Sequence, residues 1–227
     1  MPTVRANGIT MYYELHGSGE PLVLIAGLNS DHGLYRTIVP QLAAHYQVLV
    51  FDNRGVGQTD QPDVPYSMEL MADDTAALLQ AVGITKANIL GTSMGGRIAV
   101  ALALRHPDLV KRLILVSTTM SVPSRSWRRR LIALELRLPF IRHSNRYYAV
   151  RRQLDASSSA NFTSRLGEIH VPTLILHGTR DRLAPYQLAE AMREGIKGSQ
   201  LVTFGGGHLF FLLRAKQFIT AIVAFLG

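Results

Sequence analysis

Residues 89–100 read ILGTSMGGRIAV, and this stretch decides the fold. An apolar run enters a group of small residues that contains Ser93, and a second apolar run leaves it. Glycine is needed where a side chain would clash between a closely packed strand and helix. Residues 91–95 fit the pattern G-x-S-x-G, which between a strand and a helix is typical of an exposed nucleophilic serine. Ser93 is therefore a candidate nucleophile. The alternative is that the glycines only form a tight turn.

Segments with strand and helix patterns alternate on both sides of this turn. The strand-like segments are 9–17, 21–27, 47–55, 87–93, 109–118, 172–178 and 199–204. The segments with helical spacing are 34–46, 67–84, 94–107, 184–196 and 210–226. Alternation of this kind predicts an α/β fold, in which a mostly parallel sheet carries helices on both faces.

Composition limits the class of protein. A chain of 227 residues with 47% hydrophobic residues suits one large α/β domain or two small ones. It has no apolar run long enough for a membrane-spanning helix, and residues 1–10 lack the apolar core of a signal peptide. We therefore expect a soluble, cytoplasmic protein without a transmembrane segment. The absence of cysteine excludes disulfides, thiol catalysis and cysteine-bound zinc.

The net charge of +8 is concentrated in one part of the chain. Residues 119–154 hold nine arginines and a single acid, Glu135, so the rest of the chain is neutral overall. Trp127, Leu131, Leu134 and Leu138 fall on one face of a predicted helix in this segment. The plain interpretation is that this face packs over the core while the arginines stay solvated. A basic face could instead receive an acidic partner, such as an acyl-carrier protein or an anionic lipid surface. The pattern does not favour a nucleic acid, because no aromatic residues interleave with the basic ones.

A serine hydroxyl needs a base, and His208 is the best-placed candidate. It follows three glycines in the loop between the last predicted strand and the last helix, and reactive groups in such folds gather at the carboxyl ends of the strands. His177 ends an apolar strand and is interpreted as structural. No comparable setting is found for the other histidines, which are His16, His32, His45, His106, His143 and His170.

The base needs an orienting acid, for which Asp181 is the candidate. It lies just past an apolar strand, in a loop before a helix. An aspartate at such a place can also be a simple turn or cap residue. Asp52 and Asp60 compete for the role, although their segment, DNRGVGQTD, is more typical of a glycine turn held by Asp52 and Arg54.

Taken together, the segments LIAGLNSD, DNRGVGQTD, GTSMGG, HGTRDRLAP and GGGHLFF resemble the α/β-hydrolase family over nearly the whole chain. The resemblance implies an eight-stranded, mostly parallel sheet with a helical cap inserted after the sixth strand. We assign residues 1–118 and 169–227 to the core, and the arginine-rich residues 119–168 to a short cap.

The resemblance also implies roles. Ser93 would be the nucleophile, His208 the base and Asp181 the acid. The backbone N–H groups of Leu28 and Met94 would form the oxyanion hole. Relatives often carry histidine where this chain has Ala26, but a backbone donor does not depend on that side chain.

Serine at the elbow narrows the expected chemistry to acyl transfer on a small-molecule substrate. Relatives that open epoxides or cleave carbon–halogen bonds use aspartate at this position. The leading prediction is hydrolysis of carboxylic esters, lactones or thioesters. Two alternatives stay open: a carbon–carbon bond hydrolase of dienone acids, and a hydrolase-like scaffold that binds a small molecule without turning it over. No cofactor is expected, and no metal, because no histidine pair or carboxylate cluster has ligand spacing.

Overall fold

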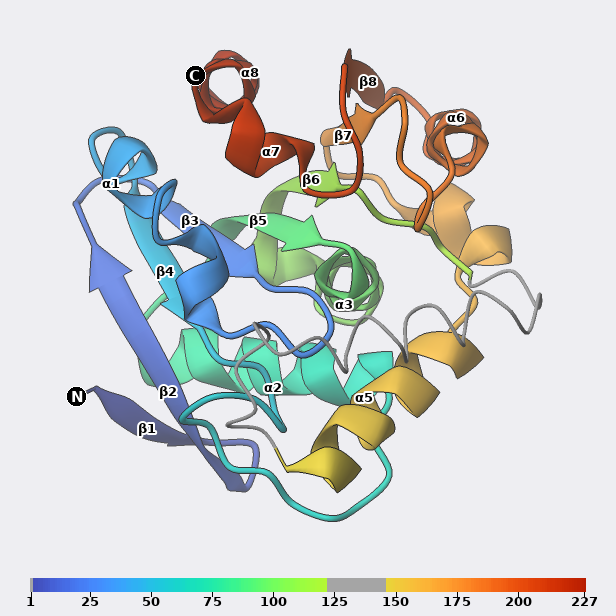
Figure 1. The fold of residues 1–227 in the computed structure, drawn as a ribbon. Helices are drawn as coiled ribbons and strands as arrows, with labels where there is room; N and C mark the ends of the chain where they lie inside the picture. The colour runs from blue at the N-terminus through green and yellow to red at the C-terminus, as the bar shows by residue number, and fades with distance from the viewer. Residues whose placement is uncertain (1, 122–145) are drawn as a thin grey trace.

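The computed structural model describes residues 2–121 and 146–227, and its centre is one eight-stranded sheet (Figure 1). The strand order is β1-β2-β4-β3-β5-β6-β7-β8. The pairs β1–β2 and β2–β4 are antiparallel, and every later pair is parallel. The strands are β1 (Thr3–Ala6), β2 (Ile9–His16), β3 (Pro21–Ile25), β4 (Gln47–Phe51), β5 (Ala87–Thr92), β6 (Val110–Val116), β7 (Thr173–Gly178) and β8 (Gln200–Phe204). The predicted mostly parallel, eight-stranded sheet is confirmed.

Helices cover both faces of this sheet. Those described are α1 (Val39–Leu42), α2 (Met68–Ala81), α3 (Met94–Arg105), α5 (Tyr147–Ser159), α6 (Tyr186–Gly195), α7 (Phe210–Leu213) and α8 (Ala215–Leu226). Three short 3₁₀ helices are also described: η1 (His32–Tyr35), η2 (Pro107–Leu109) and η3 (Thr163–Glu168). Buried residues of α2, α3 and α6 pack on one face, and those of α1, α7 and α8 pack on the other.

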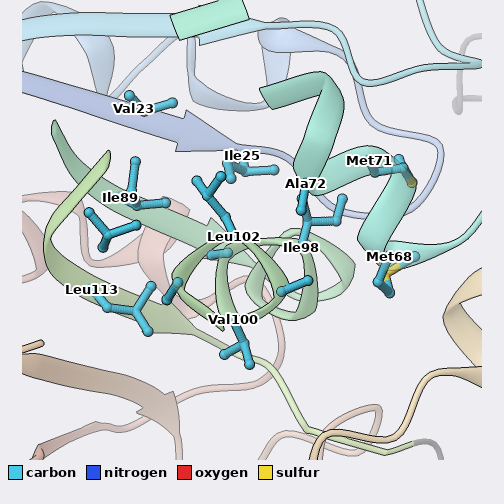
Figure 2. Packing of buried hydrophobic residues seen from close by; sticks show 14 of the residues in the cluster. Val23, Ile25, Met68, Met71, Ala72, Ile89, Ile98, Val100, Leu102 and Leu113 are labelled. Atoms are coloured by element: carbon cyan, nitrogen blue, oxygen red, sulfur yellow. The ribbon is translucent and has the colours of Figure 1, made fainter. Parts of the chain in front are cut away.

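The strand sequences explain why there are two cores. Successive side chains of a strand point to opposite faces, so a strand that is covered on both sides must be apolar throughout. In β3 and β5, Val23 and Ile89 join the core beneath α2 and α3, whereas Leu24 and Leu90 join the other core. Figure 2 shows the first of these cores, where Ile98 and Leu102 of α3 lie against the sheet. The two cores together fix the central strands, and with them the position of Ser93.

Two predicted helices are shorter than expected. The segment 34–46 was predicted as one helix, but only Val39–Leu42 is α-helical, after the 3₁₀ turn His32–Tyr35. Pro40 occupies the first turn of α1, where its missing N–H costs nothing. The predicted helix 210–226 is divided at Arg214, which has non-helical backbone angles. The strand Thr3–Ala6 was not predicted.

The predicted cap helix around Trp127 lies in residues 122–145, outside the described part of the chain. After that segment, α5 pairs Arg152 with Asp63 of the core at 3.1 Å, so at least one of the nine arginines has an acidic neighbour. None of the described helices has both the length and the apolar character needed to cross a membrane.

Candidate active site

Ser93 lies at a strained turn between β5 and α3. Its φ of +56° and ψ of −117° are backbone angles that residues other than glycine rarely adopt. Three hydrogen bonds hold the turn. The Ser93 N–H donates to the carbonyl of Val116 at 2.9 Å, and the Ser93 carbonyl accepts from the hydroxyl of Thr118 at 2.6 Å and from the N–H of Gly96 at 3.0 Å. The surrounding strands therefore impose this conformation and leave the hydroxyl free to face the loops.

The glycines around Ser93 permit backbones to approach closely. A Cβ added to Gly95 would lie 2.2 Å from the carbonyl oxygen of Ile25, at the end of β3. A Cβ added to Gly91 would lie 2.3 Å from the carbonyl oxygen of Gly95. Both neighbours are backbone atoms, so neither could move aside. The glycines therefore let α3 start directly against β3 and β5, and this is the packing that the elbow needs.

His208 reaches Ser93 from the loop between β8 and α7. Its Nε2 lies 3.0 Å from the Oγ of Ser93, and its Nδ1 lies 2.8 Å from Oδ2 of Asp181. The backbone carbonyl of His208 accepts a hydrogen bond from the hydroxyl of Ser117 at 2.7 Å, which ties the loop to the end of β6. Three residues far apart in the sequence thus form one continuous hydrogen-bonded chain.

Asp181 is nearly fully buried in the loop after β7. Its Oδ1 accepts hydrogen bonds from the N–H groups of Leu183 and Ala184, at 2.9 and 2.8 Å. Its Oδ2 therefore remains available to His208. The imidazole of His177 also lies near Asp181, with its Nε2 3.7 Å from Oδ2 of Asp181. This Nε2 donates to the carbonyl of Ala184 at 2.7 Å. Burial lowers the pKa of His177, so the ring beside Asp181 is neutral near pH 7. This arrangement agrees with the prediction that His177 is structural.

The two predicted oxyanion donors lie in segments that border Ser93. Met94 is the first residue of α3, so its N–H has no acceptor within the helix. Leu28 follows Gly27, where an added Cβ would lie 3.3 Å from the Cβ of Ser93. Within the described ranges, the N–H of Leu28 makes no backbone hydrogen bond. Both N–H groups are therefore available to an oxygen beside Ser93.

The competing aspartates are engaged elsewhere. Asp52 accepts from the Nδ1 and backbone N–H of His32, at 2.7 and 2.8 Å, and from the N–H of Gln58 at 2.8 Å. Asp60 accepts from the N–H of Thr10 at 2.7 Å. Asp52 holds the glycine turn as predicted. Arg54 instead reaches away from that turn and pairs with Asp74.

The sequence of the core matches a known family. Residues 20–146 match the family model described as alpha/beta hydrolase fold, which is more than half of the chain. The chain belongs to the alpha/beta hydrolase family. Residues 149–226 also match a model described as TAP-like protein. The predicted family and fold class are both confirmed.

Several relatives match over nearly their whole length. A protein of Azorhizobium caulinodans named as a carbamate hydrolase, RutD, is 28% identical over 263 residues, covering 100% of this chain and 98% of the relative. A 2-hydroxymuconate semialdehyde hydrolase of a Pseudomonas strain is 28% identical over 264 residues, covering 99% and 93%. Among solved structures, the enol-lactonase of Burkholderia xenovorans superposes with a TM-score of 0.91 at 26% identity, covering 99% of each chain. Hydrolase activity is thus shared by relatives that act on different bonds.

The structure adds two residues that sequence reasoning missed. Gln153, fully buried in α5, donates to the carbonyl of Arg54 at 2.8 Å and accepts from the N–H of Asn29 at 3.0 Å. It therefore links α5 to the loop that carries Leu28. Arg97 is buried in α3, one turn after Ser93. Arg97 could have been noticed in the sequence, because it is an arginine inside the apolar run that follows the Ser93 turn. Nothing in the sequence distinguishes Gln153. Within the described ranges, no cluster of three or more histidine or carboxylate side chains is arranged to hold a metal ion.

Proposed function

We propose that this protein is a serine hydrolase that cleaves carboxylic esters, including lactones and thioesters, through an acyl-enzyme on Ser93. One observation carries the proposal: the hydroxyl of Ser93 lies 3.0 Å from Nε2 of His208, whose Nδ1 lies 2.8 Å from Asp181. A serine activated in this way attacks carbonyl carbons. The lactonase named among the solved structures supports an ester substrate, because a lactone is a cyclic ester.

This geometry supports the following mechanism. The Oγ of Ser93 attacks the carbonyl carbon while Nε2 of His208 takes the hydroxyl proton. The N–H groups of Leu28 and Met94 donate to the oxyanion that forms, each contributing about 3 kcal/mol to the transition state. Collapse of this intermediate expels the alcohol, which receives the proton from His208. A water molecule that His208 deprotonates then attacks the acyl-enzyme, and the acid is released with Ser93 restored.

Asp181 has an orienting role in this scheme. Its Oδ2 accepts from Nδ1–H of His208, which leaves Nε2 as the unprotonated nitrogen that faces Ser93. The carboxylate also stabilises the imidazolium that forms during each step. The two backbone donors on Oδ1 prevent the carboxylate from rotating away.

The second candidate is hydrolysis of a carbon–carbon bond in dienone acids. The similarity to a 2-hydroxymuconate semialdehyde hydrolase over 99% of this chain favours it. A third possibility, of another class, is a binding protein that does not turn its ligand over. A complete hydrogen-bonded chain of serine, histidine and aspartate argues against that possibility, because a binding scaffold does not need one.

A fluorophosphonate probe and a panel of aryl esters test the proposal. We expect the probe to label the native chain, and we expect Ser93→Ala to abolish labelling and to lower kcat by a factor on the order of 10⁴ or more. Ser164 is an exposed serine on η3, so Ser164→Ala is the matched control and should keep both probe labelling and ester hydrolysis. Absence of labelling in folded protein would favour the binding protein. Turnover of dienone acids without turnover of esters would favour the second candidate.

We also propose that residues 119–168 form a cap over this site and that the protein acts in the cytoplasm. A short cap would leave Ser93 open to bulky acyl groups, which a comparison of short and long 4-nitrophenyl esters tests. Hydrolysis of only the ester with the smallest acyl group would count against a short, open cap. The predicted binding of an acidic partner, such as an acyl-carrier protein, concerns residues that lie mostly in 122–145, outside the described part.

A further inference from the structure

Arg97 is a charged residue within the apolar stretch of α3 that precedes Arg105. Its side chain is only 6% exposed. Its two terminal nitrogens contact hydroxyl groups: Nη2 donates to Ser157 of α5, and Nη1 lies 3.4 Å from Oγ1 of Thr119. Its Nε is buried and has no hydrogen-bond partner. A guanidinium carries five N–H donors, so this one is only partly satisfied.

No carboxylate in the described part of the chain neutralises this charge. Arg54, which is also buried, gives a direct contrast, because it donates through Nε and Nη2 to both oxygens of Asp74, each at 2.6 Å. Burial lowers the pKa of Arg97 to about 10, so the side chain remains charged at neutral pH. Burying an unpaired charge opposes folding, and proteins rarely retain one without a partner.

Arg97 lies close to the groups that form the candidate active site. Its partner Thr119 directly follows Thr118, whose hydroxyl donates to the carbonyl of Ser93. Its other partner, Ser157, lies one turn after Gln153, which binds the N–H of Asn29 beside Leu28. The guanidinium therefore lies between the nucleophile turn and α5, at the carboxyl ends of the parallel strands where such folds bind their ligands.

We infer that Arg97 determines substrate specificity by binding a free carboxylate carried by the substrate, so that the preferred substrates are esters or lactones that carry a free carboxylate group. This inference rests on the proposed function. A carboxylate would take up the unpaired Nε together with a terminal nitrogen in the two-pronged geometry that arginine favours. The hydroxyls of Ser157 and Thr119 would keep the guanidinium in place.

Two pairs of esters test the inference and separate the possible positions of the carboxylate. Mono-4-nitrophenyl glutarate is compared with 4-nitrophenyl valerate, for a carboxylate on the acyl side. To test a carboxylate on the alcohol side, 4-acetoxybenzoate is compared with phenyl acetate. We expect Arg97→Met to lower the ratio of anionic to neutral kcat/KM by about 10- to 100-fold in one of these pairs. Arg97→Lys, which keeps the charge but not the fork, should give an intermediate ratio. Arg151→Met, an exposed arginine of α5, should leave the ratios at the wild-type value.

A binding measurement keeps the inference separate from the proposed reaction. Glutarate is titrated into Ser93→Ala by calorimetry, with and without Arg97→Met, after circular dichroism has shown that each variant is folded. We expect Arg97→Met to raise the Kd for glutarate at least about tenfold. Unchanged ratios in both ester pairs, or glutarate binding that does not depend on Arg97, would overturn the inference. Failure of the proposed function would give a different result: the wild-type protein would not be labelled by the fluorophosphonate probe and would not hydrolyse the neutral esters.

Discussion

Asp181 uses its two carboxylate oxygens for different partners, and this asymmetry makes its role testable. Asparagine has one acceptor and one donor end. If its oxygen faced Leu183 and Ala184, its NH₂ would face Nδ1 of His208 and force the proton onto Nε2. If the amide were turned the other way, its NH₂ would face the N–H groups of Leu183 and Ala184, and these donors would lose their acceptor. We therefore expect Asp181→Asn to lower kcat by about 10⁴-fold while the protein stays folded, measured by steady-state kinetics with circular dichroism.

The competing acid Asp60 supplies the control for this substitution. It is exposed, and within the described residues its carboxylate accepts a hydrogen bond only from the backbone N–H of Thr10. Asp60→Asn should therefore keep kcat within a few-fold of the wild type. Equal losses in the two variants, or full activity of Asp181→Asn, would contradict the assignment of Asp181 as the orienting acid.

His177 makes folding stability depend on pH. Burial lowers the pKa of this ring below its ordinary value near 6.5. As the pH falls below 6.5, the unfolded chain binds a proton that the folded chain does not, so the free energy of unfolding falls. The slope reaches at most about 1.4 kcal/mol per pH unit from this one group. We expect His177→Gln to flatten the slope of urea-unfolding free energy between about pH 6.5 and pH 5.

An exposed histidine separates this effect from a general one. His45→Gln removes a histidine from the surface beside α1 and should leave the slope as it is in the wild type. A slope that is unchanged by His177→Gln, or flattened equally by both substitutions, would show that the pH dependence arises elsewhere.

Among the candidate site residues, the three that form the hydrogen-bonded chain could be predicted, and those that contact the surrounding loops could not. Ser93, Asp181 and His208 each come shortly after a predicted strand, so the sequence indicates both the residue type and the end of the sheet. Gln153 supports the Leu28 loop from more than a hundred residues away, and no local pattern predicts such a contact. Arg97 interrupts an apolar helix, but a sequence does not tell whether a buried arginine has an acidic partner.

At the scale of elements, the start of α3 depends on the absence of one methyl group. Alanine at position 95 would place its Cβ 2.2 Å from the Ile25 carbonyl oxygen, so α3 would have to move away from β3. We expect Gly95→Ala to lower the free energy of unfolding by about 3 kcal/mol or more and to reduce activity, because Ser93 moves with the helix. Gly167 of η3 has no atom within 4 Å of an added Cβ. Gly167→Ala should therefore change stability by no more than about 0.5 kcal/mol in the same urea titration. Similar costs at the two positions would contradict this account of the elbow.

The lengths of the helices were harder to predict than their order. Residues 210–226 are apolar enough for one continuous helix, yet the chain turns at Arg214, whose Nε donates to the carbonyl of Gly205 at 2.7 Å. This contact joins the helix break to the loop that carries His208. Phe210 and Phe211 of α7 can then be buried while α8 follows its own direction along the sheet. Tertiary packing thus overrides a local helical pattern at a place that positions the site.

For the whole molecule, the alternation of strands and helices was sufficient to predict the layers but not the position of every strand. The apolar runs of β3, β5 and β7 indicate strands that are covered on both faces, and the structure buries them completely or almost so. β1 is only four residues long and buries only Ala6, which is why its sequence carries no clear strand signal. The order of the strands depends on contacts between distant segments, so no local pattern predicts it, and the family resemblance supplied only the number of strands and their mostly parallel arrangement.

The position of the three site residues within the sheet leads to a prediction about unfolding. Ser93 follows the fully buried central strand β5, whereas His208 follows β8, an edge strand with mostly exposed residues. Edge elements with few buried contacts open at lower free energy than the core. We expect probe labelling of Ser93 in urea to be lost at a midpoint about 0.5–1 M below that of far-UV circular dichroism. Recovery of labelling on dilution would show that the first transition is reversible. If the two midpoints coincide, β8 and the His208 loop unfold together with the core, and the site is as stable as the sheet itself.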